Sequence, residues 1–476
     1  MQPLNRDEIV LFDEPGLTPA AARRLLVFYQ AYHRRNLAFF LAVRRRWHDL
    51  HRGQQFPGLC ANIHPLTGQL RPDAEQFLWG WGDARALGVW CSFFNLSEVP
   101  DVEEQVTLAD GSTYRVHLHP ELADYVEVIY AGLKDRLSRN AGVIPFRADR
   151  ASGLPTEQDA TPGGGAGGFP FANLFAVSGF VQYGLWRRDA EAVTTGLRLL
   201  RECQQEIASQ GDSGVTRHGP RMITLGVIGE GLKGLARLGA GPSLPGAVGA
   251  APESEAFAQL RADLLAPAAG YVGYILANHY REEPTAFWEV GTGTGTPQPD
   301  STGAILVDPG HATECAGFLA ELVPFLRENW PEVADEALRA ALNIHLFADR
   351  IGFLPSGAMT KYADLVTGEP LPDTQARAAE GRVTAPWWNV REHCAAALRL
   401  YTLTQDSRLI ETFRRGQHAS YLLYPNRLLN HQMIQTVDVA SREPLDVAPA
   451  TGNLDPMHDP RARIREMEYL RVLAGG

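Results

Sequence analysis

"TPAAARRLLVFYQAYHRRNLAFFLAVRRRW", residues 18–47, carries the pattern that decides the fold class. Thr18 offers a hydroxyl N-cap and Pro19 follows at the first helical position, so a helix is expected to begin here. Beyond this start, seven residues recur at spacings of three and four, as one face of an α-helix requires. They are Leu25, Phe28, Tyr32, Asn36, Phe39, Val43 and Trp47. The stretch predicts one long helix.

Eleven further stretches show helical patterns, which brings the expected total to about twelve. They are 75–95, 120–140, 171–187, 190–209, 220–239, 254–280, 311–328, 332–350, 386–403, 406–423 and 459–472. Several are joined by short turns, which are typical of antiparallel helix hairpins. Longer Gly/Pro/Thr-rich connections, mostly after alternate helices, predict short hairpins or long loops. They are 97–119, 284–310, 351–385 and 425–457.

About twelve helices without βαβ alternation leave an α-solenoid and a closed double ring of helices as the main architectures. A solenoid requires a sequence repeat of fixed period, and no strong repeat is present. We therefore expect an all-α fold, an (α/α)6 barrel with short hairpins and long loops at one end, as a single catalytic domain over residues 1–476. In such a barrel, polar residues near one end of the inner helices converge on a central pocket.

Composition excludes several classes of protein. The 476 residues are 45% hydrophobic with a net charge of −11, which argues against a nucleic-acid partner. The five cysteines are scattered without a CxxC pair, so neither a disulfide framework nor a zinc ribbon is indicated. No signal-peptide pattern opens the chain, and no apolar run reaches the ~18 residues of a membrane helix. We expect a cytoplasmic protein.

"GGGAGG", residues 163–168, lacks the GK[ST] ending of a phosphate loop and is interpreted as a linker or lid.

"VDPGHATECAGFLAEL", residues 307–322, places a histidine at the start of an apolar helix. His311 and Glu314 are three residues apart and share a helix face, so the carboxylate can orient the imidazole. The helix dipole lowers the pKa of this histidine and a carboxylate raises it, which suits a base working near neutral pH. A histidine that only caps a structural helix explains the same spacing.

Two aromatic pairs have the composition of a sugar-binding site. Trp81 and Arg85, and likewise Trp388 and Glu392, stand four residues apart on one helix face, and Trp387 lies on the adjacent buried stripe. Indole rings stack on sugar C–H faces, while charged groups bind hydroxyls or anionic groups. Surface stacking of the arginine, or core tryptophans beside a solvated glutamate, remain alternatives at this stage.

"GNLDPMHDPRARIREMEYL", residues 452–470, opens the last predicted helix. His458 precedes Asp459 and Pro460, and Arg461 follows, so an imidazole, a carboxylate and a guanidinium cluster at a helix N-terminus. An ordinary capping sequence with an incidental histidine is the alternative.

These motifs together resemble the N-acylglucosamine 2-epimerase family, which includes cellobiose 2-epimerases and aldose–ketose isomerases. The resemblance covers nearly the whole chain. "DPGHATE" is similar to the family's PGHxxE segment, "WWNVRE" to its WWxxxE segment, "HDPR" to its HxPR segment and "DARALGVW" to its QGRxxW-type segment. It implies catalytic roles for His311, His458, Arg85 and Glu314. It implies substrate contacts from Trp387, Trp388, Glu392, Asn173, Trp81 and Arg461.

The chain departs from the family at two points. Asp83 and Ala84 stand where Gln-Gly is usual, and Met222, Ile223 and Thr224 stand where several members carry a further histidine. The second departure argues against the cellobiose and mannose-isomerase subtypes. The resemblance implies metal-independent and cofactor-free chemistry in a homodimer.

The function predicted is sugar 2-epimerisation of an open-chain aldose or N-acylhexosamine through an enediolate. His311 and His458 would act as the acid/base pair, with Glu314 orienting His311 and Arg85 stabilising the oxyanion. An aldose–ketose isomerase is the nearest alternative. A glycoside hydrolase or lyase using two of Glu314, Glu392, Asp83 and Asp459, or a non-catalytic sugar-binding barrel, are the others.

Overall fold

The computed structural model describes residues 10–51, 56–60, 63–64, 66–69, 76–156, 170–209, 215–240, 255–373, 381–426, 432–445 and 454–475. Within them lie twelve α-helices, which confirms the expected number. They are α1 (Pro19–Leu50), α2 (Gly80–Asn95), α3 (Leu118–Arg139), α4 (Phe171–Arg187), α5 (Ala190–Ser209), α6 (Gly219–Ala240), α7 (Glu255–His279), α8 (Pro309–Leu326), α9 (Pro331–Gly352), α10 (Trp387–Thr404), α11 (Arg408–Leu423) and α12 (His458–Leu473).

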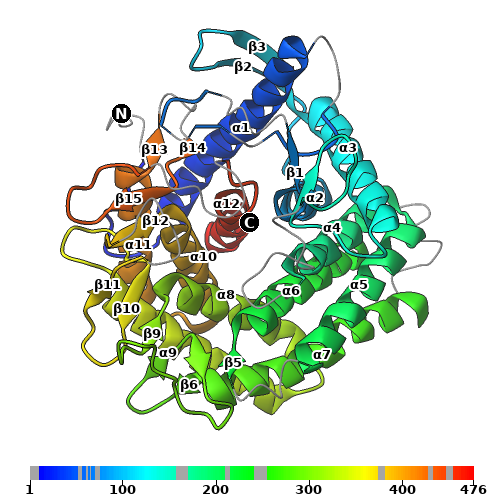
Figure 1. Cartoon of the computed structure of the whole chain (residues 1–476). Helices are drawn as coiled ribbons and strands as arrows, with labels where there is room; N and C mark the ends of the chain where they lie inside the picture. Colours follow the sequence, from blue (N-terminus) through cyan, green and yellow to red (C-terminus); the bar gives the residue numbers. More distant parts are fainter. Residues whose placement is uncertain are drawn as a thin grey trace.

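The helices form two concentric rings. The even-numbered helices pack on one another in chain order from α2 to α12, and α12 also contacts α2, so the inner ring is closed. Each odd-numbered helix lies outside and packs on an inner helix: α1 on α12, α3 on α2, and so on around the ring. This arrangement is the predicted (α/α)6 barrel (Figure 1).

Sequence polarity decides which ring a helix occupies. Helix α4 is buried without interruption from Ala172 to Leu185, as an element covered on both sides must be. Helix α5 instead buries one stripe that includes Leu199 and Cys203, and its other face is more exposed. The two meet at Arg188, which adopts the left-handed conformation that ends α4.

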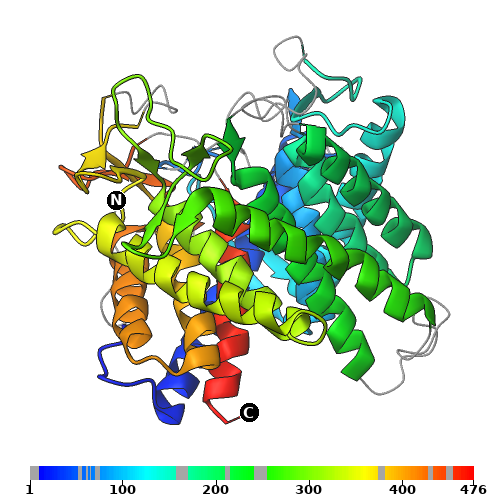
Figure 2. The same cartoon turned by 90° about the horizontal axis from the view of Figure 1, so that it is seen from below.

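Short strands gather at one end of the barrel, opposite the C-terminus (Figure 2). In the described residues they make seven small antiparallel sheets. The strands are β1 (Phe77–Trp79), β2 (Glu103–Thr107), β3 (Thr113–His117), β4 (Arg147–Asp149), β5 (Thr216–Arg217), β6 (Tyr280–Arg281), β7 (Ala286–Phe287), β8 (Val290–Gly291), β9 (Leu306–Val307), β10 (Tyr362–Asp364), β11 (Pro370–Leu371), β12 (Thr384–Pro386), β13 (Pro425–Asn426), β14 (Gln432–Met433) and β15 (Thr436–Asp438).

Most long connections lead from an outer helix to the N-terminus of the next inner helix. One long connection in the described residues runs the other way, from inner to outer helix: the β2–β3 hairpin between α2 and α3, in the stretch expected to hold a hairpin or loop. The N-terminal turns of the inner helices therefore meet the long connections at the end of the barrel where the strands gather.

Local interactions shift some predicted boundaries. Residues 77–79 pair with β4 as strand β1, so α2 begins at Gly80 and not near residue 75. Helix α8 begins at Pro309, two residues earlier than expected, because the Asp308 side chain caps it. The Gly163–Gly168 segment lies outside the described residues.

The five cysteines are free and buried, in agreement with the expected lack of a disulfide framework. Among the described helices, none combines the length and apolarity that crossing a membrane demands.

Candidate active site

The two predicted catalytic histidines lie against the same tryptophan. The Trp388 ring centroid is 5.3 Å from that of His311 and 5.2 Å from that of His458. The Trp387 ring meets His458 edge-on at 6.2 Å. His311, Trp388 and His458 occupy the first turns of α8, α10 and α12. The barrel therefore brings together residues that are up to 147 positions apart in the sequence.

The first turn of α8 fixes the position of His311. The Asp308 side chain accepts hydrogen bonds from the backbone N–H groups of Gly310 (3.0 Å) and His311 (3.2 Å). The ring Nδ1 of His311 lies 3.1 Å from Glu289 Oε2 and 3.4 Å from Asp308 Oδ2. Burial alone would lower the pKa of His311, but the two carboxylates outweigh it and raise the pKa to about 9.

Glu289 also binds a second histidine, since the buried ring of His218 places Nε2 2.9 Å from Glu289 Oε1. Burial would raise the pKa of Glu289, but His218 and His311 outweigh it and hold the pKa well below its usual range. The prediction that Glu314 orients His311 is wrong, because Glu314 Oε1 accepts a hydrogen bond from Arg461 (2.6 Å). The carboxylate beside the His311 ring is instead that of Glu289, which comes from the loop between β7 and β8.

His458 is held in the same manner by Glu392. Its Nδ1 lies 2.9 Å from Glu392 Oε1, and its backbone N–H donates to Asp455 (2.6 Å) at the start of α12. Burial would raise the pKa of Glu392, but Arg461 and His458 lower it to about 2. Glu392 is therefore a carboxylate at neutral pH, and it stabilises a proton on His458 Nδ1.

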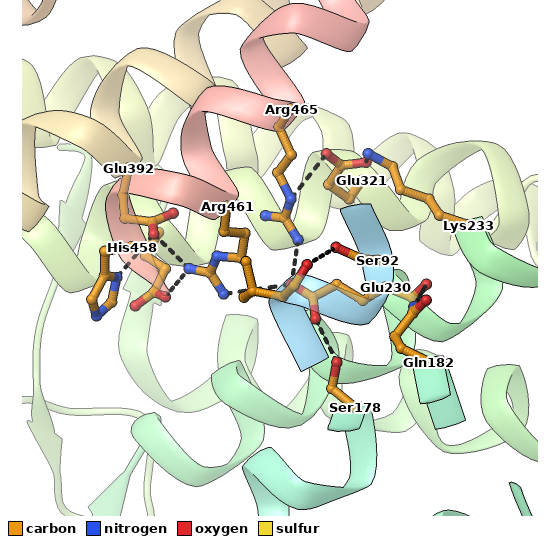
Figure 3. Close-up of polar contacts among 12 residues, drawn as sticks. Ser92, Ser178, Gln182, Glu230, Lys233, Glu321, Glu392, His458, Arg461 and Arg465 are labelled. Carbon is orange, nitrogen blue, oxygen red and sulfur yellow. Dashed lines mark hydrogen bonds and ion pairs between the residues drawn. The ribbon is translucent and has the colours of Figure 1, made fainter. Parts of the chain in front are cut away.

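Arg461 joins the two inner helices that carry the glutamates. One of its terminal nitrogens donates to Glu392 Oε1 at 2.5 Å and to Glu314 Oε1 at 2.6 Å, and the other lies 3.8 Å from Glu230 (Figure 3). The prediction that Arg461 binds substrate is not supported by these contacts, because its guanidinium is committed to carboxylates in the barrel interior. A buried guanidinium requires such partners.

Polar pairs continue from Arg461 to Arg465, four residues further along α12 (Figure 3). Arg465 donates to Glu230 at 3.1 Å, and Lys233 lies 2.7 Å from Glu321. Ser178 donates to Glu230 at 2.7 Å. A series of ion pairs between the inner helices therefore fills this part of the barrel interior.

Arg85 lies on α2 with its guanidinium 4.7 Å above Trp81 and 4.3 Å above Phe175. Asp455 is its nearest carboxylate, at 3.9 Å, and its Nε is buried without a hydrogen-bond partner in the part of the chain that the structure describes. Burial lowers its pKa to about 10, so the side chain remains charged at neutral pH. Arg85 lines a small cavity with Ser178, Glu230 and Arg461.

Asn173, predicted to face the pocket, has a different role. Its Oδ1 accepts from the backbone of Ile144 (2.8 Å) and its Nδ2 donates to Gly142 (3.1 Å), so it anchors the connection that precedes α4.

Sequence reasoning missed Glu289, Asp308, His218 and Lys361. Lys361 pairs with Asp308 and lies 4.4 Å above the Trp388 ring. Only Asp308 carried a readable signal, as an N-cap residue before Pro309. The other three lie in or beside irregular connections, where periodicity gives no information about position.

Comparison with known proteins identifies the fold. No family model matches this sequence, and no curated protein matches it. Among solved structures, cellobiose 2-epimerase from Spirochaeta thermophila superposes with a TM-score of 0.62 at 14% identity, over 95% of this chain and 98% of that one. D-mannose isomerase gives 0.59 at 12% identity, over 93% and 97%. Cellobiose 2-epimerase from Bacillus thermoamylovorans gives 0.58 at 13% identity, over 90% and 98%. The chain thus has a barrel fold that is also found in carbohydrate epimerases and isomerases.

Proposed function

We propose that the chain is a sugar 2-epimerase that acts on an open-chain aldose or N-acylhexosamine through an enediolate. The observation that carries this proposal is a pair of histidine–carboxylate dyads, His311–Glu289 and His458–Glu392, whose imidazoles both pack against Trp388. The fold shared with sugar epimerases and isomerases supports the same class of substrate.

The dyads suit proton transfer at carbon. In each, a carboxylate holds Nδ1, so Nε2 is the nitrogen that meets the substrate. Removal of the C2 proton next to the aldehyde gives an enediolate, and inversion requires one group on each face of that intermediate. His311, whose pKa of about 9 keeps it protonated at neutral pH, supplies a proton to one face, while His458 takes the C2 proton from the other, and the roles are exchanged in the reverse direction.

Arg85 would stabilise the enediolate oxygen, because it is a cation at neutral pH and lines the interior cavity. Trp81 and Phe175 pack against the guanidinium and fix its plane. Trp387 and Trp388 would offer ring faces to the sugar. Glu392 acts on the substrate through His458, since its Oε1 is shared between that ring and Arg461.

Aldose–ketose isomerisation uses the same enediolate and differs only in protonation at C1. Glycoside hydrolysis needs a carboxyl group whose pKa is raised, together with a second carboxylate across the glycosidic bond. Glu392 has a pKa lowered to about 2, and Asp83 is buried in an ion pair with Arg136. Asp459 is engaged by Arg391 at 2.9 Å. These carboxylates are ionised or held in ion pairs inside the barrel, so they do not supply the protonated carboxyl group that hydrolysis needs. This favours the proton-transfer function.

Proton NMR in D2O with N-acetylglucosamine, N-acetylmannosamine, glucose, mannose, fructose and cellobiose tests the proposal. Loss of the C2–H signal together with formation of the C2 epimer is expected, and a ketose product would indicate the isomerase. His311→Asn and His458→Asn should each lower the exchange rate by roughly 10²–10⁴-fold.

His418→Asn is the matched control. His418 is a partly exposed histidine on the outer helix α11, and it too is paired with a carboxylate, Asp13 at 3.0 Å. The control should retain full activity. If both active-site variants fold and exchange C2–H at the wild-type rate, the assignment is refuted. As the resemblance implies, we also propose a homodimer, and a monomeric mass in sedimentation would contradict it.

A further inference from the structure

Three metal-ligating side chains converge beside the His311 dyad. His218 directly precedes α6, Glu289 lies between β7 and β8, and His311 is in the first turn of α8. Their ligand atoms all lie within 4.8 Å of one another. His218 Nε2 is 2.9 Å from one Glu289 oxygen, and His311 Nδ1 is 3.1 Å from the other.

We propose that His218, Glu289 and His311 bind a divalent transition-metal ion of the zinc class. Two imidazole nitrogens and one carboxylate suit Zn²⁺, Co²⁺ or Fe²⁺, whereas Mg²⁺ and Ca²⁺ prefer oxygen ligands. In a tetrahedral zinc site with bonds of about 2.0–2.2 Å, neighbouring ligand atoms are roughly 3.3 Å apart. His218 Nε2 and His311 Nδ1 lie 2.9 and 3.1 Å from the two oxygens of Glu289, and each of the three residues offers a ligand atom within 4.8 Å of the others, so local side-chain movement can close the triad on one ion. A fourth position stays open for water or a ligand.

The surrounding charges distinguish this triad from a second group of possible metal ligands. Glu314, Glu392 and His458 also place their ligand atoms within 4.8 Å of one another. Arg461 donates to both glutamates of that second triad, so a cation already occupies the space between them. At the His218 triad, the additional carboxylate is Asp308, 3.4 Å from His311 Nδ1, and the nearby cation Lys361 pairs with Asp308, which is not a member of the triad. A metal ion is therefore favoured at the His218 triad.

Two buried ring nitrogens provide an independent observation. His218 Nδ1 and His279 Nε2 are fully buried, and neither has a hydrogen-bond partner among the described residues. The two rings are 5.3 Å apart. His279 Nδ1 lies 3.1 Å from the Trp288 carbonyl and donates to it, so its Nε2 is an acceptor.

Metal binding would give one of these nitrogens a role. An ion on Nε2 of His218 places the proton of that ring on Nδ1, and the His279 ring, whose centroid is 5.3 Å away, carries an acceptor nitrogen. Histidine ligands of metals regularly donate their other N–H in this way.

The metal would also change the neighbouring chemistry, a consequence that rests on the proposed function. An ion on His311 Nδ1 leaves that ring with a single proton fixed on Nε2, so the ring can no longer alternate between the acid and base forms that the two directions of the reaction require. Zinc should therefore inhibit C2–H exchange. The binding site itself does not depend on the protein being an epimerase.

Isothermal titration of tag-free, chelator-treated protein with Zn²⁺ tests the site, with Mg²⁺ for comparison. One equivalent of zinc should bind, Mg²⁺ should not, and Co²⁺ should show the visible spectrum of a four-coordinate ion. His218→Ala and Glu289→Gln should each weaken zinc binding by roughly 100-fold or more. His458→Asn, which disrupts only the second triad, should bind zinc as the wild type does.

Three results would overturn the site: no stoichiometric binding, wild-type affinity in both folded variants, or loss of binding in His458→Asn. Glu289→Gln keeps the side-chain volume, so it remains a test if the buried His218 variant does not fold. Zinc binding without any C2–H exchange on any sugar would refute the proposed function and leave the metal site standing. Exchange that zinc does not inhibit would refute only the inhibitory consequence.

Discussion

Gly310 offers a sharp test of how the site is positioned. It precedes His311 in the first turn of α8, and a Cβ added there would lie 2.6 Å from Trp388 Cζ3 and 2.5 Å from Asn389 Cγ. Ordinary contact begins near 3.4 Å, so the alanine is about 0.8 Å too close to the indole. Asn389 is fully buried and donates to the Thr360 carbonyl at 3.0 Å, so it has little freedom to yield.

Gly310→Ala should therefore displace either the first turn of α8 or the Trp388 ring, and both changes alter the His311–Trp388 geometry. A misplacement of about 1 Å costs on the order of 10²-fold in rate where catalysis depends on orientation. Crowding of a packed site should also lower the free energy of unfolding by about 1–3 kcal/mol. The rate of C2–H exchange in D2O and a urea denaturation curve measure the two effects.

Gly317→Ala on the same helix is the matched control. Its Cβ would meet Ala396 Cβ at 3.5 Å, an ordinary contact. Replacing glycine with alanine inside a helix should stabilise the protein by up to ~1 kcal/mol and leave the exchange rate unchanged. If Gly310→Ala exchanges C2–H within about threefold of the wild type, the inference that this turn positions the catalytic histidine is wrong.

Two further predictions concern buried charge. His345 is fully buried between Thr313 (2.9 Å) and Thr412 (3.1 Å), and burial lowers its pKa to about 3. Because the unfolded chain binds that proton below about pH 6.5, stability is lost as pH falls, by roughly 2 kcal/mol at pH 5. His345→Gln should reduce the loss of unfolding free energy between neutral pH and pH 5 by that amount. If urea denaturation gives the same pH dependence of the unfolding free energy for both proteins, the prediction is wrong. Arg136→Met should destabilise by about 3–5 kcal/mol, because it leaves the buried carboxylate of Asp83 unpaired. Removing Asp83 as well should recover part of this loss in a double-mutant cycle, and additive losses would argue against the pair.

The helices could be predicted because their signal is local. The stretches 171–187 and 190–209 coincide with α4 and α5, since apolar periodicity and the turn between them lie within the same residues. The strands carried no such signal. β1 pairs with β4 and β12 with β15, the paired residues being fifty or more positions apart, and each strand has only three residues. Such pairs form because the barrel brings the connections together.

The same distinction explains which site residues could be read. His311, Trp388 and His458 stand in first turns of inner helices, and motif position located them correctly at one end of the barrel. Glu289 could not be found, because its role depends on where a loop lies relative to α8. Lys361 was missed for the same reason, since it reaches Asp308 from the loop before β10.

Glu314 shows why a correct local rule can still assign the wrong partner. Residues three apart on a helix do share a face, yet the face of α8 that carries Glu314 points into the barrel. There Arg461 arrives from α12, the last helix of the inner ring, and a buried guanidinium binds the carboxylates within reach. His311, one turn earlier, lies at the partly exposed mouth and takes its carboxylate from a loop. The two dyads are thus supported differently, one by the connections and one by closure of the ring through α12. Loss of α12 should therefore remove His458 and Arg461 together, and Glu392 and Glu314 would lose the cation that they share.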